Sequence, residues 1–562
     1  MNSAVAFLGV CALVAITASI PFARSASEPE SFPVEINVDA AHKEGQFREI
    51  WRFFGADEPN YATAPNGEKL LGELGKLRTD QVFFRTHNLL TTGDGKPALK
   101  WGSTNAYTEN SKGEPVYDWT ILDQIFDTYR KRHIKPYVEV GFMPEALSVH
   151  PEPYRHQWGI TKNANLFTGW AYPPKDYGKW QDLVYQWVKH CVARYGKREV
   201  EQWYWEIWNE PNIGYWQGTP QEFQKLHDFA VAGVRQALPT AKVGGPDTAG
   251  GGKYFRDFIE HCLHGQNSAT GQVGTPLNFV SFHAKGSPTT LDGHIRMGIS
   301  NQLRTVEENF RIVASFPELK NTPIVIGESD PEGCAACTSS NFSYRNGTVY
   351  SSYTAAVFAR KLDLAKKYDV NLEGALTWAF TFADQPYFAG FRQLASQGID
   401  LPVLNVFRMY GKMGGERVSA VSSAETSLDE IIKDGVRQTP DVGSLATLER
   451  HKLAVMVWHY HDDDIAGPAA EVTLHLANIP LGSGRAKLSE FRIDANHSNS
   501  FAVWQAMGSP QNPTQDQVKM LEAAGQLGEV KDQQKAIEVK DGLATIKTTL
   551  PRQGVSLFVV NW

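Results

Sequence analysis

Residues 201–212 read EQWYWEIWNEPN, and this stretch decides how the chain is expected to fold. Its first eight residues are rich in aromatic side chains and contain no Gly or Pro, which favours a β-strand buried on both faces. Pro211 cannot donate a backbone hydrogen bond, so we expect the strand to end there with Glu210 at its tip. A carboxyl group in apolar surroundings favours its neutral form, as a general acid requires, although a strand-end glutamate can also simply cap a turn.

A second carboxyl group has the same setting further along the chain. Residues 322–331 read TPIVIGESDP, an apolar run followed by Glu328 and then by a proline. In a retaining glycosidase one carboxyl group protonates the leaving oxygen, and another, about 5–5.5 Å away, attacks the anomeric carbon. Glu210 and Glu328 therefore have the setting that such a catalytic pair requires.

Strand-like runs alternate with amphipathic helical patterns eight times from Trp51 onward. Residues 118–133, for example, carry apolar side chains at helical spacing. Eight such units predict an α/β fold, a (β/α)8 TIM barrel over residues 49–415, with its active site at the carboxyl ends of the strands. The expected strands are residues 51–56, 81–87, 136–142, 201–209, 242–246, 278–284, 323–328 and 373–380.

Polar residues or a tryptophan occur at the carboxyl ends of most of these strands. Core packing does not readily explain such a convergence at the edge where a barrel places its active site. For Arg85 and His283, the plainer alternative is a buried ion-pair network without substrate contact. The residues concerned are Arg85, His87, Glu139, Asp247, His283, Lys285 and Trp378.

The chain beyond the barrel has a different pattern. Residues 416–562 contain short runs of alternating apolar and polar residues, which predict an accessory antiparallel β-sandwich. Residues 27–48 include a similar strand-like run, which we expect to join that sandwich. The sandwich can bind carbohydrate or serve as a structural cover, and the cover is the preferred interpretation.

The amino-terminal segment has the features of an export signal. Residues 4–22 are uncharged and largely apolar, and small residues follow as far as Ala26. We interpret residues 1–26 as a signal peptide, with a mature chain that begins near residues 24–28 and is periplasmic or secreted. A membrane anchor is the alternative, and no other segment has the length and hydropathy to cross a bilayer.

Charge and cysteine content exclude several functional classes. A net charge of −7 gives no electrostatic footprint for nucleic acid or for an anionic membrane. Cys334 and Cys337 are spaced like half of a metal or redox motif, but no second pair completes it, so a disulfide that stiffens the loop is preferred. Residues 459–464 are interpreted as a solvated turn rather than a metal site. We expect no metal and no cofactor.

The motifs together resemble those of a known enzyme family. Trp-Asn-Glu-Pro-Asn at residues 208–212, followed by Ile-Gly-Glu at residues 326–328, resembles the (β/α)8 glycoside hydrolases, specifically family 39 of β-xylosidases and α-L-iduronidases. The resemblance covers roughly residues 50–415. It implies that Glu210 is the acid/base, that Glu328 is the nucleophile and that Asn209 binds the sugar 2-hydroxyl. The other substrate-binding residues that we expect are Arg85, His87, His283, Lys285, Arg345 and Trp378.

Two features concern the choice of sugar. Many family xylosidases have His-x-Tyr where this chain has His283-Ala284-Lys285, and the iduronidase branch uses a lysine here and a later arginine, corresponding to Arg345, to bind a uronate carboxylate. A bacterial subgroup that shares His-Ala-Lys-Gly and Asp-Pro-Glu-Gly-Cys is nevertheless assigned as β-xylosidase. The resemblance therefore implies release of xylose from the non-reducing ends of β-xylo-oligosaccharides.

Other interpretations stay open at this point. The chain can act on an α-L-iduronide or an α-L-arabinoside, or it can be a carbohydrate-binding barrel without turnover. The expected partner is an oligosaccharide rather than nucleic acid or, after signal cleavage, a membrane. The oligomeric state is left open.

Overall fold

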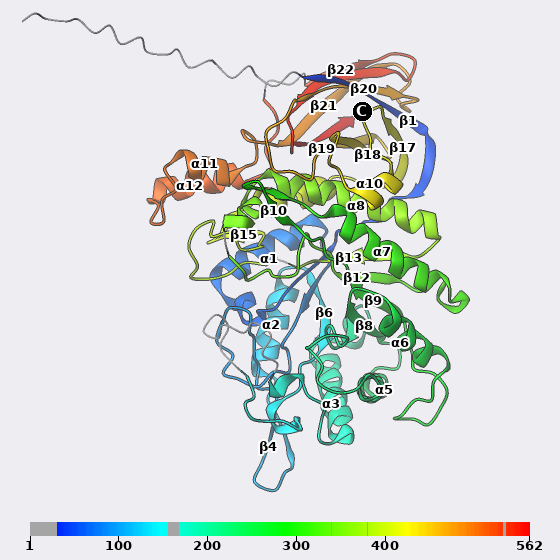
Figure 1. The fold of residues 1–562 in the computed structure, drawn as a ribbon, viewed down its shortest axis with the longest axis vertical. Helices are drawn as coiled ribbons and strands as arrows, with labels where there is room; N and C mark the ends of the chain where they lie inside the picture. The colour runs from blue at the N-terminus through cyan, green and yellow to red at the C-terminus, as the bar shows by residue number, and fades with distance from the viewer. Residues whose placement is uncertain (1–30, 156–167, 339, 379, 532–534) are drawn as a thin grey trace, which may run out of the picture.

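The computed structural model describes residues 31–155, 168–338, 340–378, 380–531 and 535–562. The predicted signal peptide, residues 1–26, lies outside these ranges. Among the described residues, no helix is long and apolar enough to span a membrane. The described chain forms two main sheets, a barrel in the lower part of Figure 1 and a second sheet above it.

The first sheet is a parallel barrel, as the sequence predicts. Its order is β13-β12-β9-β8-β7-β6-β3-β2-β14, and the barrel is nearly closed because β13 and β14 are consecutive pieces of the eighth strand. β13 pairs with β12, and β14 pairs with β2. In chain order the strands are β2 (Phe53–Ala56), β3 (Val82–Thr86), β6 (Ile134–Val140), β7 (Tyr204–Ile207), β8 (Lys242–Ala249), β9 (Phe279–His283), β12 (Ile324–Glu328), β13 (Leu372–Ala375) and β14 (Thr377–Trp378).

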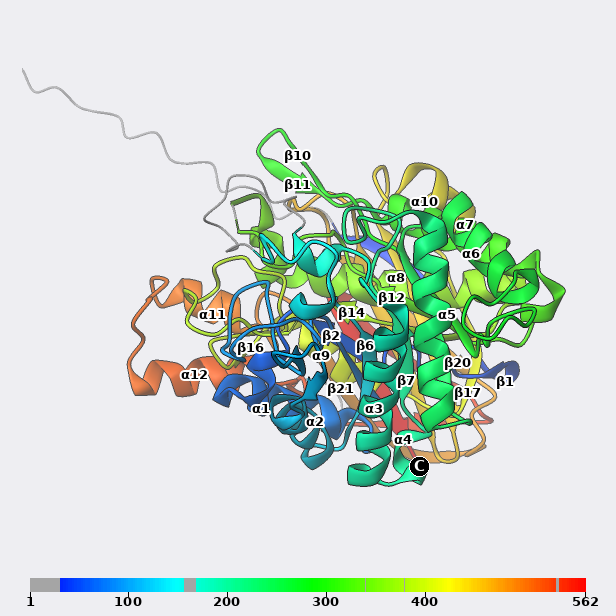
Figure 2. The same cartoon turned by 90° about the horizontal axis from the view of Figure 1, so that it is seen from below.

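Helices surround this barrel, as both views of the ribbon show (Figures 1 and 2). α5, for example, begins at two sequence signals, the Thr219–Glu222 capping box and Pro220. The barrel helices are α1 (Pro65–Leu77), α2 (Thr120–Lys131), α3 (Tyr177–Tyr195), α5 (Pro220–Ala237), α6 (Lys253–His264), α7 (Ile299–Ala314), α8 (Thr348–Tyr368) and α9 (Pro402–Tyr410).

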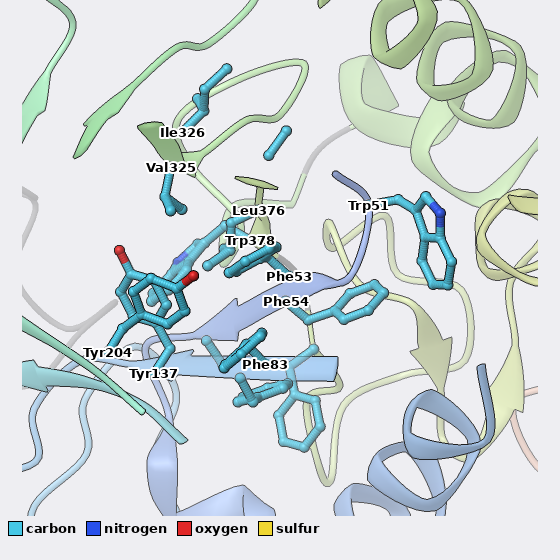
Figure 3. Close-up of a cluster of buried hydrophobic side chains, with 14 of the residues drawn as sticks. Trp51, Phe53, Phe54, Phe83, Tyr137, Tyr204, Val325, Ile326, Leu376 and Trp378 are labelled. Carbon is cyan, nitrogen blue, oxygen red and sulfur yellow. The ribbon is translucent and has the colours of Figure 1, made fainter. Parts of the chain in front are cut away.

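Aromatic side chains fill the barrel near the starts of its strands (Figure 3). The rings of Phe53 and Phe83 stack with centroids 5.0 Å apart, and those of Tyr137 and Tyr204 stack with centroids 5.1 Å apart. All four side chains are almost fully buried. This apolar plug closes the amino-terminal end, so the polar residues of the barrel gather at the carboxyl ends of the strands.

Among the residues that the structure describes, three short hairpins lie within the barrel's connections, and the sequence pattern did not predict them. They are β4 (Tyr107–Glu109) with β5 (Pro115–Tyr117), β10 (Thr289–Leu291) with β11 (His294–Arg296), and β15 (Ala395–Ser396) with β16 (Ile399–Asp400). Their strands have only two or three residues, too few for an alternating pattern to be recognised. The predicted strand at residues 201–209 is also shorter, because residues 201–203 form a turn after α4 (Lys197–Val200).

The second sheet contains the amino-terminal strand and the carboxyl-terminal strands. Its order is β22-β21-β24-β19-β18-β17-β1-β20-β23. The strands are β1 (Phe32–Gln46), β17 (Glu416–Ser422), β18 (Asp441–Glu449), β19 (Lys452–Tyr460), β20 (Ala470–Ala477), β21 (Gly484–Ile493), β22 (Ala536–Val539), β23 (Ala544–Leu550) and β24 (Val555–Asn561).

One ladder of this sheet contradicts the purely antiparallel expectation. β1 pairs antiparallel with β17 but parallel with β20, from Phe32 opposite Ala470 to Asp39 opposite Ala477. Strands joined by a tight hairpin must be antiparallel, whereas β1 and β20 lie far apart in the chain and have no such constraint. Strands from both ends of the sheet, including β22 through Ile537 and β23 through Ile546, share one buried cluster, so the sheet curls around a common core.

Candidate active site

The chain changes direction sharply directly after β7. Trp208 and Glu210 both have left-handed backbone conformations, with φ of 73° and 44°. Such conformations are uncommon for residues with a Cβ and persist where surrounding contacts hold them. Here the Glu210 N–H donates to the carbonyl oxygen of Asp247 at 2.9 Å, so β8 holds the turn that β7 makes.

The two predicted carboxylates lie side by side at the carboxyl ends of β7 and β12. One oxygen of Glu210, one oxygen of Glu328 and a ring nitrogen of His283 all lie within 4.8 Å of one another. The Glu210 side chain is 14% exposed, and that of Glu328 is 5% exposed. Inverting glycosidases separate their carboxyl groups by about 6.5–9.5 Å to admit a water, so this short spacing fits the retaining arrangement.

His283, at the end of β9, links Glu210 to Asp247. Its Nδ1 lies 2.7 Å from Glu210 Oε1, and its Nε2 lies 2.7 Å from Asp247 Oδ2. Nδ1 is also 3.7 Å from Glu328 Oε1. Burial disfavours a charged imidazole, but the carboxylates of Asp247, Glu328 and Glu210 outweigh burial and raise the pKa of His283 to about 10.

Cations surround Glu328. Lys285 Nζ forms an ion pair with its Oε2, and Arg85 Nη1 lies 3.9 Å from its Oε1. Burial alone would raise the pKa of Glu328, but His283 and Lys285, with smaller contributions from His87 and Arg85, hold it well below the usual range. Glu328 is therefore ionised at neutral pH, as a nucleophile must be.

Arg85 lies at the centre of a buried group of carboxylates. Its guanidinium forms ion pairs with Glu206 and Asp247, and its Nη2 lies 3.0 Å from Glu139 Oε2. Arg85 also donates to Asn209 Oδ1 at 3.1 Å. Arg85 thus holds the end of β7, and the plainer alternative of a buried ion-pair network describes most of its contacts.

The side-chain NH2 group of Asn209 is available to a ligand. Its Oδ1 accepts from Arg85, while its buried Nδ2 has no hydrogen-bond partner among the described residues. A buried donor without a partner is costly unless a ligand satisfies it. This geometry suits donation to a sugar hydroxyl beside Glu210.

His87 and Trp378 form one wall of the site. The two rings lie with centroids 4.3 Å apart, and the Arg85 guanidinium lies over the Trp378 ring at 5.1 Å. His87 Nδ1 is paired with Asp57 Oδ1 at 2.6 Å. Trp378 is only 2% exposed, so it fixes the positions of His87 and Arg85 rather than presenting an open stacking surface.

Arg345 occupies a different place from the one expected. Its guanidinium donates to the carbonyl oxygens of Cys334, Cys337 and Gly390 at 2.9, 2.8 and 3.0 Å, and pairs with Glu332 at 3.0 Å. Cys334 and Cys337 form a disulfide within the same loop. Among the described residues, these contacts engage Arg345 in the loop that follows Glu328, and they do not bring it to the carboxylate pair.

Asp247 and Glu206 are acidic residues of the site that were not among the predicted site residues. Asp247 lies near the end of β8 and contacts both Arg85 and His283; the sequence marked it only as one polar strand end among several. Glu206 lies within β7, fully buried, with Arg85 and Tyr137 as partners. A glutamate inside an otherwise apolar strand was the available signal, because such a charge must find a buried partner.

Comparisons with known proteins agree with this geometry. The family model "Glycosyl hydrolases family 39" matches residues 34–537. A β-xylosidase of Geobacillus stearothermophilus is 27% identical over 551 residues, which cover 94% of this chain and 95% of the relative. The human α-L-iduronidase is 26% identical over 556 residues, which cover 91% of this chain and 76% of the relative.

Solved structures have the same fold. The monomeric β-xylosidase from Caulobacter crescentus CB15 aligns with a TM-score of 0.71 at 22% identity, covering 94% of this chain and 99% of that one. A β-xylosidase and an α-L-iduronidase thus match at similar identity, so the comparisons do not decide between these two kinds of substrate.

Proposed function

The chain belongs to glycosyl hydrolase family 39, and we propose that it is a retaining exo-glycosidase that releases xylose from the non-reducing ends of β-xylo-oligosaccharides. One observation carries the choice of a neutral sugar. The two cations that would bind a uronate are engaged elsewhere, Lys285 with Glu328 and Arg345 with the loop carbonyls. A pentose has no carboxylate to satisfy, so it leaves both of these arrangements in place.

The geometry supports a double-displacement reaction. Glu210 protonates the glycosidic oxygen while Glu328 attacks the anomeric carbon, which gives a covalent glycosyl-enzyme and a free alcohol. Glu210, now ionised, then takes a proton from water, and the resulting hydroxide equivalent displaces Glu328. Asn209 Nδ2 is positioned to donate to the sugar 2-hydroxyl, a contact that strengthens as charge develops on the ring.

An α-L-iduronide is the second candidate substrate. It is favoured by the similarity to the human α-L-iduronidase and by a lysine within reach of the nucleophile. On this alternative, Lys285 leaves Glu328 when substrate binds. An α-L-arabinoside is a third candidate, and a barrel that binds sugar without turnover is the alternative from a different class.

A panel of aryl glycosides separates these candidates. We expect the highest kcat/KM with the β-D-xyloside, compared with the α-L-arabinoside and the α-L-iduronide, and no turnover of any of them by Glu328→Gln. Preference for the α-L-iduronide would overturn the xylosidase assignment. Absence of turnover on every sugar, with retained binding of xylo-oligosaccharides, would favour the non-catalytic barrel.

Two further assignments belong with this function. The chain is exported with cleavage near residues 24–28, a proposal supported by the apolar run at residues 4–22. Amino-terminal sequencing of the exported protein tests it, and recovery of Met1 contradicts it.

The curled nine-stranded sheet is a two-layer sandwich that covers the barrel, and its shared core supports that assignment.

A further inference from the structure

We propose that Asp247 and His283 hold the proton that Glu210 donates, so that the resting enzyme keeps it on His283 Nδ1 and substrate binding transfers it to Glu210. Asp247 and His283 are then positioning residues that act through Glu210. This inference rests on the proposed role of Glu210 as the acid/base.

Asp247 holds Glu210 through two separate contacts. Its carbonyl oxygen accepts the Glu210 N–H at 2.9 Å, and its carboxylate binds His283, whose other nitrogen contacts the Glu210 carboxyl group. Asp247 also approaches the nucleophile strand closely, since a Cβ on Gly327 would overlap its carboxylate. Asp247 therefore lies next to the backbone of β12 as well as to Glu210, and so adjoins both carboxylates of the pair.

Three carboxylates contact or face the His283 ring, each from a different strand. They are Glu210 after β7 at 2.7 Å, Asp247 on β8 at 2.7 Å and Glu328 on β12 at 3.7 Å. The nearby cations contact these carboxylates, Arg85 on β3 with Asp247 and Lys285 with Glu328. The remaining charged groups of the cluster, Glu139, Glu206 and His87, lie around Arg85.

This arrangement favours a positively charged His283 in the resting enzyme. Three anions near one buried imidazole stabilise the imidazolium, and the raised pKa of His283 agrees with that charge state. An imidazolium donates from both nitrogens, which satisfies Asp247 and Glu210 together. In the resting enzyme Glu210 is then a carboxylate anion paired with the His283 cation, whereas cleavage of the glycosidic bond needs Glu210 as a neutral carboxylic acid.

Substrate binding supplies the change that moves the proton. The Glu210 side chain is 14% exposed, so it is the part of the pair that still contacts solvent. A sugar and its leaving group over Glu210 exclude this water, and loss of water disfavours an ion pair relative to two neutral groups. The proton then moves from His283 Nδ1 to Glu210 Oε1, which leaves a neutral imidazole with its Nε2–H on Asp247.

The proton balance closes over one turnover. Glu210 passes the proton to the glycosidic oxygen as the C1–O bond breaks and the Glu328 ester forms. In the second half, the attacking water gives one proton to Glu210 as its oxygen bonds to C1 and Glu328 leaves. That proton returns to His283 Nδ1 when the product leaves and water enters again.

Nitrogen NMR of the wild-type chain tests the resting state without substrate. With 15N-labelled histidine and the His283→Gln variant for assignment, we expect both His283 nitrogens to have imidazolium shifts at pH 7.5. Neutral-imidazole shifts at that pH would overturn the proposal. The readout needs no knowledge of the sugar, so it stands apart from the proposed function.

The pH dependence of kcat/KM tests the role of Asp247. For an aryl glycoside with a poor leaving group, Asp247→Asn should move the basic limb to lower pH by about one unit or more, because the imidazolium loses one of its anions. Glu206→Gln is the matched control, since Glu206 contacts Arg85 and Tyr137 in the same buried cluster, and its basic limb should stay in place. Equal shifts in the two variants, or none in either, would contradict the proposal.

Failure of the proposed function would look different. Glu210→Ala would then hydrolyse substrates with poor leaving groups at the wild-type rate, whatever the protonation state of His283. If Asp247→Asn does not fold, the NMR measurement on the wild-type chain decides the question alone.

Discussion

Lys285 Nζ forms an ion pair with Oε2 of Glu328, the carboxylate that ends β12. His283 lies 3.7 Å from the other oxygen, so each oxygen of this carboxylate faces a cation. The contact explains how a nearly fully buried glutamate stays ionised. It also engages the lysine that would otherwise attract an acidic sugar.

Replacement of Lys285 by Met should move the acidic limb of the pH profile. Glu328 must be ionised to attack, and with Lys285 present its pKa lies well below the usual range. Without that cation the pKa of Glu328 rises, so activity on an aryl β-xyloside should fall at a pH about one unit higher than in the wild type. Lys320→Met, an exposed lysine paired with Asp369, is the control. A loss confined to acidic sugars, with the acidic limb in place, would instead support the iduronidase-like alternative.

Replacement of Arg345 by Met should reduce stability rather than substrate affinity. The buried guanidinium binds three loop carbonyls and Glu332, and its loss leaves these acceptors with fewer partners. We expect the free energy of unfolding in urea to fall by about 3 kcal/mol, with KM of the folded enzyme little changed. Arg311→Met, at an exposed site, should leave the free energy of unfolding nearly unchanged. A large rise in KM without loss of stability would show that Arg345 binds substrate.

Replacement of Lys361 by Met should stabilise the protein at neutral pH. Lys361 on α8 is fully buried, its Nζ has no hydrogen-bond partner among the described residues, and burial lowers its pKa to about 7. Because an unfolded lysine keeps its proton up to about pH 10.4, the unfolded state binds more protons between these values and wild-type stability rises with pH there.

The methionine variant lacks this titration. Its advantage in the free energy of unfolding should be on the order of 2–4 kcal/mol near pH 7 and should shrink as the pH approaches 10. Lys366→Met, an exposed position on the same helix, is the control. An advantage that is absent at pH 7, or that does not change with pH, would contradict the buried, neutral lysine.

Glu210→Ala should separate substrates by their leaving groups. Substrates with poor leaving groups need protonation, so their hydrolysis should fall by about 100-fold or more, whereas glycosyl-enzyme formation from activated aryl glycosides should be spared. Added azide should restore turnover, because a small anion replaces the activated water. Glu328→Ala should instead lose activity with every leaving group, and any azide rescue should give a product of the opposite anomeric configuration. Equal impairment of both substrate types by Glu210→Ala, without an azide effect, would contradict the assignment of Glu210.

The sequence predicted the parts of the site that depend on short-range pattern. Glu210 and Glu328 each follow an apolar run and precede a proline, so their positions at strand ends could be inferred from local composition. Eight strand-like runs alternating with helical patterns predict a barrel, and a barrel places the carboxyl ends of all its strands at one edge. The barrel therefore also explains why His283 lies close to both glutamates.

The parts that were not predicted depend on contacts between distant segments. Arg345 follows β12 in the chain, but the disulfide loop after that strand folds so that its carbonyl oxygens accept hydrogen bonds from the guanidinium. Asp247 matters because its backbone and its side chain both reach Glu210, which requires the relative positions of β7, β8 and β9. The parallel pairing of β1 with β20 likewise joins strands from opposite ends of the chain.

The most direct test of the catalytic pair is to identify the residue that carries the sugar in the covalent intermediate. The enzyme is incubated with an activated 2-deoxy-2-fluoro derivative of its best glycoside and digested, and its peptides are examined by mass spectrometry. We expect one added sugar on the peptide that contains Glu328, with Glu210 unmodified. A sugar on Glu210, or rapid turnover to an inverted product with no covalent adduct, would contradict it.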